Sequence, residues 1–297
     1  MKCLHPITIR APEGSGIHAG YHYILVPCGK CPVCLRKRQQ DWSIRIQNEA
    51  EYTEKHGGAV YFITLTYDDE HLPIGDGIPT LYKPDLSGFF KRFRQRLDYH
   101  FDIKLRFFAC GEYGDSFDRP HYHAVIFLDK FISASELRPF IVDSWKDGLV
   151  LGVHFLTPKL SEYVAKYSCK QFGVDYESLG IQSPFGLMSL KPAIGACFVD
   201  PDTLEGKKNI EFYRKNNLFH TFDSTHTPYG LPRYYRSRIH SRSQLDAWVD
   251  ELLDRDFLKF SMDSKLGYAS QVFEEFRAYE AYEKNFVKKL KHGKFKL

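Results

Sequence analysis

Two histidines stand at alternate positions in RPHYHAVIF, residues 119–127. Side chains two apart in a β-strand point to the same face, so His121 and His123 lie side by side if this apolar segment is a strand. Buried imidazoles need polar partners, and two of them with a carboxylate suit a divalent cation. Glu112 ends the preceding apolar segment, and a hairpin would bring it beside the pair. The alternative is two histidines hydrogen-bonded within a core, without a metal.

A second candidate site is YVAKY, residues 163–167. Tyr163 and Tyr167 stand one helical turn apart and share a face if the segment is a helix. A phenol has a pKa of about 10, so it needs a lowered pKa or a polarised target to act as a nucleophile. A cation on a phosphate, assisted by Lys166 or Lys170, would polarise the target. Two phenols would let one hold a DNA end covalently while the other attacks; the alternative is a half-buried helix stripe.

The segment CGKCPVC predicts a metal site near the N-terminus. It holds three of the seven cysteines: Cys28, Cys31 and Cys34. In a chain without a recognisable secretion signal, thiolates at this spacing favour metal over disulfides. Zinc is the predicted ion, with Cys3 as the fourth ligand and His18 or His22 as alternatives. An iron–sulfur cluster lacks the usual fourth cysteine close behind, and metal-free thiols are the remaining alternative. Because a basic helix follows, we interpret the site as a structural clamp.

The elements that must position these residues predict an α+β fold. Four apolar, β-branched segments are expected to be strands: 59–67, 104–113, 120–128 and 151–157. Four helices are expected around them: 35–54, 85–101, 133–145 and 159–172. This order predicts an antiparallel sheet with helices packed on it, of the split βαβ kind. Two C-terminal helices are expected as well, at 244–260 and 268–292.

These patterns divide the chain into four parts. Residues 1–58 hold the cysteine-rich zinc element and the basic helix. Residues 59–175 hold the sheet with both candidate catalytic motifs. Residues 176–243 are rich in Gly, Pro and Asn and predict a loop-rich extension that contacts DNA. Residues 244–297 hold the C-terminal helices.

The charge distribution favours a nucleic-acid partner more than the total charge does. The formal net charge of +4 over 297 residues is only mildly basic. Basic residues nevertheless gather among aromatics at 30–45 and 233–242, a composition typical of surfaces that follow phosphates and stack bases. Solvated helix faces are the alternative. No apolar run is long enough to span a bilayer, so no membrane partner is expected. The candidate DNA-binding residues are Arg36, Lys37, Arg38, Arg45, Arg233, Arg236 and Arg238.

The order of the motifs resembles a known family. FITLTY, GEYG, RPHYHAVIF and EYVAKYSCK follow one another as in the HUH single-strand endonucleases that start rolling-circle replication. PCGKCPVC, LKPAIG and YGLPRYYRSR are similar to the replication initiators of small single-stranded DNA phages, the microviruses, and in particular the gokushovirus branch. The resemblance covers most of residues 1–240 and little of the chain after 244.

This resemblance implies an HUH endonuclease palm and a set of site residues. His121 and His123 match the two motif histidines that bind magnesium or manganese, and Glu112 is the implied third ligand. Tyr163 and Tyr167 match the paired nucleophiles, and one of the two lysines named above matches the motif lysine. In the first-motif strand, Thr64 and Thr66 fit either a DNA-positioning role or simple strand propensity.

The implied reaction nicks a single-stranded or melted origin. Tyrosine attack would give a 5′-phosphotyrosine and a free 3′-hydroxyl, and the second tyrosine would religate the strand. The sequence contains no P-loop motif, so a host helicase and a host DNA polymerase are expected partners, in the cytoplasm of the bacterial host. Three alternatives stay open: a non-catalytic zinc-containing nucleic-acid-binding protein, a nuclease that uses water, and an HUH transposase or relaxase.

Overall fold

The computed structural model describes residues 3, 5–10, 23–114, 119–157, 164–165, 176–222, 228–249 and 251. Of the helix predicted over 159–172, Val164 and Ala165 are described, and both are helical. Of the helix predicted over 244–260, residues 242–249 are helical, and the helix predicted over 268–292 lies outside the described residues. In the described part of the chain, no helix is both long and apolar enough to cross a membrane.

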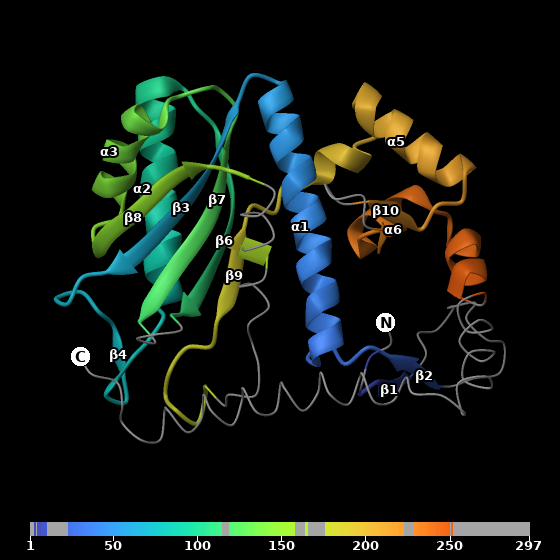
Figure 1. The fold of residues 1–297 in the computed structure, drawn as a ribbon, viewed down its shortest axis with the longest axis horizontal. Coiled ribbons are helices and arrows are strands. Elements are labelled where there is room, and N and C mark those ends of the chain that lie inside the picture. Colours follow the sequence, from blue (N-terminus) through green and yellow to red (C-terminus); the bar gives the residue numbers. More distant parts are fainter. Residues whose placement is uncertain are drawn as a thin grey trace.

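A five-stranded antiparallel sheet forms the centre of the molecule, as predicted (Figure 1). Its spatial order is β8-β3-β7-β6-β9. The strands are β3 (Ala59–Tyr67), β6 (Leu105–Tyr113), β7 (Pro120–Leu128), β8 (Gly148–Phe155) and β9 (Phe185–Met188). The first four correspond to the predicted strands. β9 was not predicted, because its FGLM sequence is short and lies in a stretch rich in glycine and proline.

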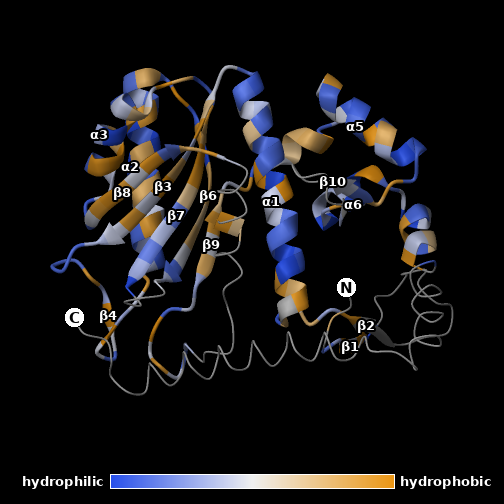
Figure 2. Cartoon of the chain, in the orientation of Figure 1, coloured by the Kyte–Doolittle hydropathy of each residue, from blue (hydrophilic) through white to orange (hydrophobic). Residues whose placement is uncertain are grey.

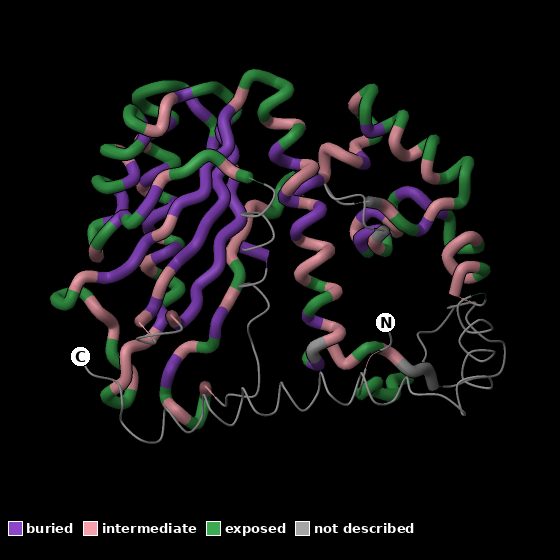
Figure 3. Tube along the Cα trace, viewed as in Figure 1, coloured by how far each residue is buried: buried purple, intermediate pink, exposed green. Residues whose placement is uncertain are grey.

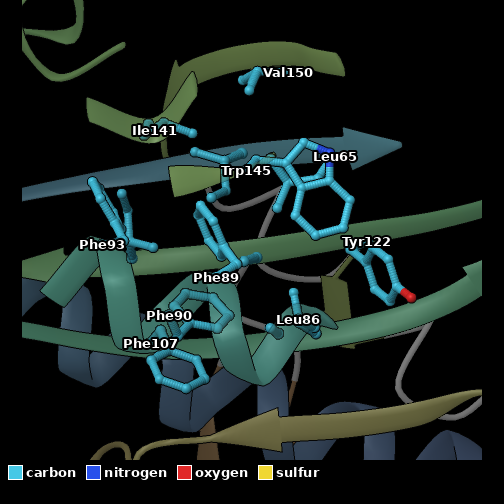
Figure 4. Packing of buried hydrophobic residues seen from close by; sticks show 14 of the residues in the cluster. Leu65, Leu86, Phe89, Phe90, Phe93, Phe107, Tyr122, Ile141, Trp145 and Val150 are labelled. Atoms are coloured by element: carbon cyan, nitrogen blue, oxygen red, sulfur yellow. The ribbon is translucent and has the colours of Figure 1, made fainter. Parts of the chain in front are cut away.

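Two amphipathic helices, α2 (Lys83–Phe101) and α3 (Ala134–Ser144), cover one face of the sheet (Figure 1). The phenylalanines of α2 are fully buried, and Phe90 stacks on Phe107 of β6 with ring centroids 3.5 Å apart. Trp145, just after α3, packs against the same core (Figure 4). The predicted capping box is present at the start of α3, where Ser133 and Glu136 exchange hydrogen bonds.

The long basic helix α1 (Pro32–Lys55) lies against the other face of the sheet (Figure 1). Its Ile46 and Ala50 share a second apolar cluster with Phe62 of β3 and Phe127 of β7. Alternate residues of the central strands therefore belong to different cores, and these strands are buried on both sides (Figure 3). The outer surface of α1 is strongly hydrophilic, in contrast to the strands beside it (Figure 2).

Residues 190–239, part of the expected loop-rich extension, form a compact unit on the side of α1 away from the sheet (Figure 1). It contains the 3-10 helix η1 (Ala196–Val199), α5 (Leu204–Lys215) and α6 (Arg233–Ile239). A short hairpin of β10 (His220–Phe222) and β11 (Pro228–Gly230) joins α5 to α6. The glycine, asparagine and lysines of α5 conceal its amphipathic pattern, although Thr203 caps it through the amide of Gly206.

Two further hairpins lie outside the main sheet. One is formed by β1 (Ile7–Arg10) and β2 (Tyr23–Val26), close to the start of α1 (Figure 1). The other is formed by β4 (Ile74–Gly75) and β5 (Ile78–Pro79), just before α2. The first brings the N-terminal residues beside the cysteine segment that opens α1.

Candidate active site and zinc centre

The strand register brings the candidate metal ligands together. Glu112 of β6 lies opposite His121 of β7, and Thr64 of β3 lies opposite His123. With the side-chain period of two, all four point to the face against which α1 packs. We call this the histidine face.

His123 is held from both edges of its ring. Its Nε2 lies 3.0 Å from Oε1 of Glu112, and its Nδ1 lies 3.1 Å from Oγ1 of Thr64. The Phe62 ring stacks on the imidazole at 5.6 Å. His123 and Glu112 are only 6% and 4% exposed. A buried carboxylate–imidazole pair of this kind fixes the ring orientation and directs Nε2 toward the carboxylate.

His121 lies next to this pair in a similar orientation. Its ring is nearly parallel to that of His123, with centroids 6.5 Å apart. Its Nδ1 donates to the Arg119 carbonyl oxygen at 2.6 Å, so the Nε2 lone pair is left available. Burial lowers the pKa of His121, which favours the neutral form that binds metals.

The three side chains do not form a closed metal cage. Among the described residues, the compact group of potential metal ligands is the cysteine cluster, whose ligand atoms all lie within 4.8 Å of one another. His121 is therefore further from the Glu112–His123 pair than full coordination would require. The donor set still fits magnesium or manganese, because it offers two imidazoles and a carboxylate and leaves room for water and a phosphate oxygen.

The predicted nucleophiles Tyr163 and Tyr167, with Lys166 and Lys170, lie outside the described residues. The residue that follows the first tyrosine, Val164, is described, fully buried and helical. It joins the apolar cluster on the histidine face, which includes Phe62 and Phe127. Its carbonyl oxygen accepts a hydrogen bond from the Cys110 thiol at 3.7 Å, and Cys110 is the β6 partner of His123. The YVAKY segment thus packs on the same side of the sheet as the histidines.

A third histidine, which the sequence analysis missed, also lies on this face. His154 of β8 pairs with Phe62, and a Cβ added at Gly152 would lie 2.5 Å from its Nε2. The imidazole therefore covers Gly152, which is the strand partner of Thr64. The two threonines differ: Thr64 contacts His123, whereas Thr66 donates to the Pro120 carbonyl oxygen at 3.2 Å. The signal for His154 was its even spacing within LGVHFLT, which becomes informative only with the strand pairing.

The N-terminal cysteines form a compact cluster at the start of α1. The Sγ atoms of Cys3, Cys28, Cys31 and Cys34 lie within 4.8 Å of one another. Cys3 Sγ is 3.5 Å from Cys28 Sγ and 3.8 Å from Cys31 Sγ. Tetrahedral zinc with bonds of about 2.3 Å separates its sulfurs by about 3.8 Å, so the four thiols fit this ion. Of the predicted fourth ligands, Cys3 is at the cluster, and His18 and His22 lie outside the described residues.

Backbone amides prepare one of these sulfurs for metal binding. Burial alone would raise the pKa of the Cys28 thiol, but the amides of Lys30 and Cys31 donate to its sulfur and lower the pKa to about 6. Burial raises the pKa of Cys34 to about 12. A zinc ion would convert all four thiols to thiolates regardless of these differences.

Arg45, predicted to contact DNA, holds two parts of the fold together. Its guanidinium lies between the rings of Trp42 and Tyr234, at 4.2 and 4.4 Å from their centroids. Its Nε and Nη2 donate to the Ile194 carbonyl oxygen at 2.9 and 2.8 Å. Lys37 also bridges α1 to the 190–239 unit, through Asp41 and the Gly230 carbonyl oxygen.

The other predicted DNA contacts differ in how accessible they are. Arg36 and Arg38 are exposed along α1, and Arg233 and Arg238 are exposed on α6. Arg236 is half-buried against the Trp248 ring at 4.7 Å. The structure therefore brings basic residues of two distant segments onto neighbouring helices and leaves four of them facing solvent.

Comparisons with known proteins place the chain in a family. A family model described as a replication-associated protein of the ORF2 type matches residues 60–172. Replication-associated protein ORF4 of Chlamydia phage 1 is 30% identical over 253 residues, which are 78% of this chain and 59% of that protein. Replication-associated protein ORF2 of Spiroplasma virus 4 is 26% identical over 289 residues, 91% of this chain and 87% of that protein. The chain belongs to the replication-associated proteins of microviruses.

A third relative of this microvirus family is replication-associated protein VP4 of Bdellovibrio phage phiMH2K, 27% identical over 75% of this chain and 70% of that protein. No solved structure matches. The predicted resemblance to microvirus replication proteins is confirmed. The family model covers β3, β6, β7 and β8, and with them the histidine pair and the YVAKY segment.

Proposed function

We propose that this microvirus protein initiates rolling-circle replication by nicking a single-stranded or melted origin. Tyr163 or Tyr167 is the nucleophile, and His121, His123 and Glu112 hold a divalent cation. The observation that carries the proposal is the burial of Val164 on the histidine face, where Cys110 bonds to its carbonyl oxygen. The segment with both phenols is thereby anchored on the sheet face that bears the imidazoles.

The ligand residues support magnesium or manganese at this position. In both histidines Nδ1 already has an oxygen partner, from Arg119 or Thr64, and such outer partners set the tautomer of metal-binding imidazoles. The Nε2 atoms are then the ligand atoms, with Glu112 as the carboxylate. A bound cation would stabilise the negative charge that develops on the scissile phosphate.

The reaction of the chain's own residues is a transesterification. The tyrosine Oη bonds to phosphorus while the bond from phosphorus to the 3′ oxygen breaks, and the leaving 3′-hydroxyl takes up a proton. Lys166 or Lys170 assists by balancing charge on the phosphate. Because the phosphotyrosine conserves the bond energy, the second tyrosine can restore the strand without ATP. The 3′-hydroxyl would prime a host polymerase, with a host helicase opening the duplex in the bacterial cytoplasm.

The cysteine cluster would hold zinc in a structural role. It ties the β1–β2 hairpin region to the first turn of α1, and α1 carries the exposed Arg36 and Arg38. A closed site with four thiolate ligands leaves no position for substrate. We therefore assign the zinc to orientation of a DNA-contacting helix.

A covalent-adduct assay tests the proposal. The protein is incubated with manganese and labelled single-stranded oligonucleotides that tile the genome encoding it. An adduct that survives denaturing electrophoresis, and that is lost in the Tyr163→Phe/Tyr167→Phe double variant, supports the enzyme. Binding without an adduct supports the non-catalytic alternative, and cut ends without attached protein support a nuclease that uses water. The names of the relatives favour replication over transposition or relaxation.

A further inference from the structure

A second concave site lies in the 190–239 unit, on the side of α1 away from the sheet (Figure 1). It is an open pocket of about 890 Å³ between η1, one side of α5 and α6. Val199, Ile210 and Pro192 give it an apolar wall. Small-molecule sites of proteins combine such a wall with a few polar groups in a volume of roughly 300–1,000 Å³.

The pocket has an excess of positive charge. Four cations line it, against the carboxylates of Asp200 and Glu211. In the described part of the chain, none of the four forms an ion pair. Unpaired cations around an apolar wall suit an anion that carries an apolar group. The cations are Lys207, Arg214, Lys215 and Arg238.

The pocket also offers one flat surface for stacking. The Tyr234 ring is covered on both faces, by Arg45 at 4.4 Å and by Arg238 at 3.6 Å. The outer plane of the Arg238 guanidinium is therefore the flat group that faces the pocket. Arg238 is exposed, and its Nη1 donates to the Tyr234 carbonyl oxygen at 3.1 Å, which holds the plane in place. Guanidinium planes stack well on nucleobases.

We propose that this pocket binds a nucleotide of single-stranded DNA. The base lies between the Arg238 plane and the apolar wall, and Lys207 and Lys215 neutralise the adjoining phosphates. The proposal rests on the proposed function in one respect, the choice of DNA as the source of the nucleotide. Because α1 separates the pocket from the histidine face, the nucleotide bound here lies apart from the scissile phosphate and belongs to the recognised part of the origin.

Two neighbouring lysines provide a matched test. Lys207 lines the pocket, whereas Lys208 is exposed on α5 outside it, so Lys207→Glu and Lys208→Glu change the charge equally. Affinity for a mixed-sequence single-stranded oligonucleotide is measured by fluorescence anisotropy in the full-length protein, without manganese. We expect Lys207→Glu to weaken binding at least fivefold more than Lys208→Glu. Equal losses in the two variants would overturn the site.

Two further arms define the ligand. Arg238→Lys keeps the charge and removes the plane, so it should weaken binding of the oligonucleotide severalfold and leave binding of an abasic strand unchanged. Equal effects on both strands would overturn base stacking. Deoxynucleoside monophosphates that bind as tightly as the strand, with the same sensitivity to Lys207→Glu, would overturn the assignment to DNA. Failure of the adduct assay would not affect any of these results, because binding is measured without the nicking reaction.

Discussion

The Glu112 carboxylate and the His123 Nε2 atom lie 3.0 Å apart on adjacent strands, with both side chains buried. Thr64 occupies the other ring nitrogen from a third strand. The imidazole orientation is therefore set by three strands that are distant in sequence. On the proposed function, this orientation positions a metal ligand.

Loss of the Thr64 hydroxyl should weaken metal binding. Thr64→Val keeps the side-chain shape but leaves Nδ1 of His123 without its partner, and loss of such outer partners costs roughly 10- to 100-fold in metal affinity. Manganese affinity is measured by calorimetry. Thr66→Val is the control, because its hydroxyl contacts the Pro120 carbonyl oxygen instead. An unchanged affinity in Thr64→Val would count against Nδ1 as the outer contact.

Zinc should be bound at one ion per chain. Removing it with a chelator, or replacing Cys28 with serine, should lower the melting temperature, because a structural zinc site contributes to folding free energy. Zinc content is measured by elemental mass spectrometry and melting by calorimetry. Cys197→Ser is the control, since Cys197 lies outside the cluster. Wild-type protein that is purified with zinc available and carries none would refute the site.

Arg45 should matter for stability. Arg45→Ala removes two hydrogen bonds to Ile194 and the contact between α1 and α6, and we expect the free energy of unfolding to fall by about 2–3 kcal/mol. Arg45→Lys should recover only part of this, because an ammonium neither forks nor stacks. Urea unfolding provides the measurement. Wild-type stability in Arg45→Ala would show that α1 and α6 are held by other contacts.

Arg36 should show the opposite behaviour. It is exposed on the same helix, so Arg36→Ala should change the free energy of unfolding by less than about 0.5 kcal/mol. If Arg36 contacts a phosphate of single-stranded DNA, the slope of log affinity against log salt should fall in magnitude by about 0.7. Salt titrations of oligonucleotide binding provide the test, and an unchanged slope would remove Arg36 from the DNA-binding surface.

Stability should decline in mild acid because of His240. Burial lowers the pKa of His240, and its Nδ1 is buried without a partner in the described part of the chain. The unfolded chain therefore takes up this proton more readily, so stability is full above about pH 6.5 and is lost as the pH falls below it. His240→Gln keeps a donor for the Leu218 carbonyl oxygen and should flatten the dependence. Urea unfolding near pH 7.5 and pH 5.5 compares the two, and equal slopes would contradict it.

The sheet and the histidine face were predictable because alternation in a strand is local. Once 120–128 is read as a strand, His121 and His123 must share a face, and the hairpin to Glu112 is short. The Thr64 contact was beyond this reasoning, since it depends on β3 pairing with β7, which does not neighbour it in sequence. His154 was missed for the same reason, because its proximity follows from the pairing of β3 with β8.

The basic residues were harder to assign. Sequence alone does not separate an exposed arginine from one that packs between rings, and Arg45 and Arg36 stand on one helix with opposite surroundings. The 190–239 unit was difficult because its elements are short and its core is shared with α1 through Ile44. Its helices become evident only when Tyr235 and Leu231 have partners to pack against.

The most direct measurement of the nicking mechanism locates the bond between protein and DNA. The protein is incubated with manganese and single-stranded origin DNA, digested with protease and nuclease, and analysed by mass spectrometry for nucleotide-bearing peptides. We predict a nucleotide on Tyr163 or Tyr167 that is absent from the His121→Ala/His123→Ala variant. A nucleotide on any other residue, or an adduct that persists without the two imidazoles, would contradict the mechanism.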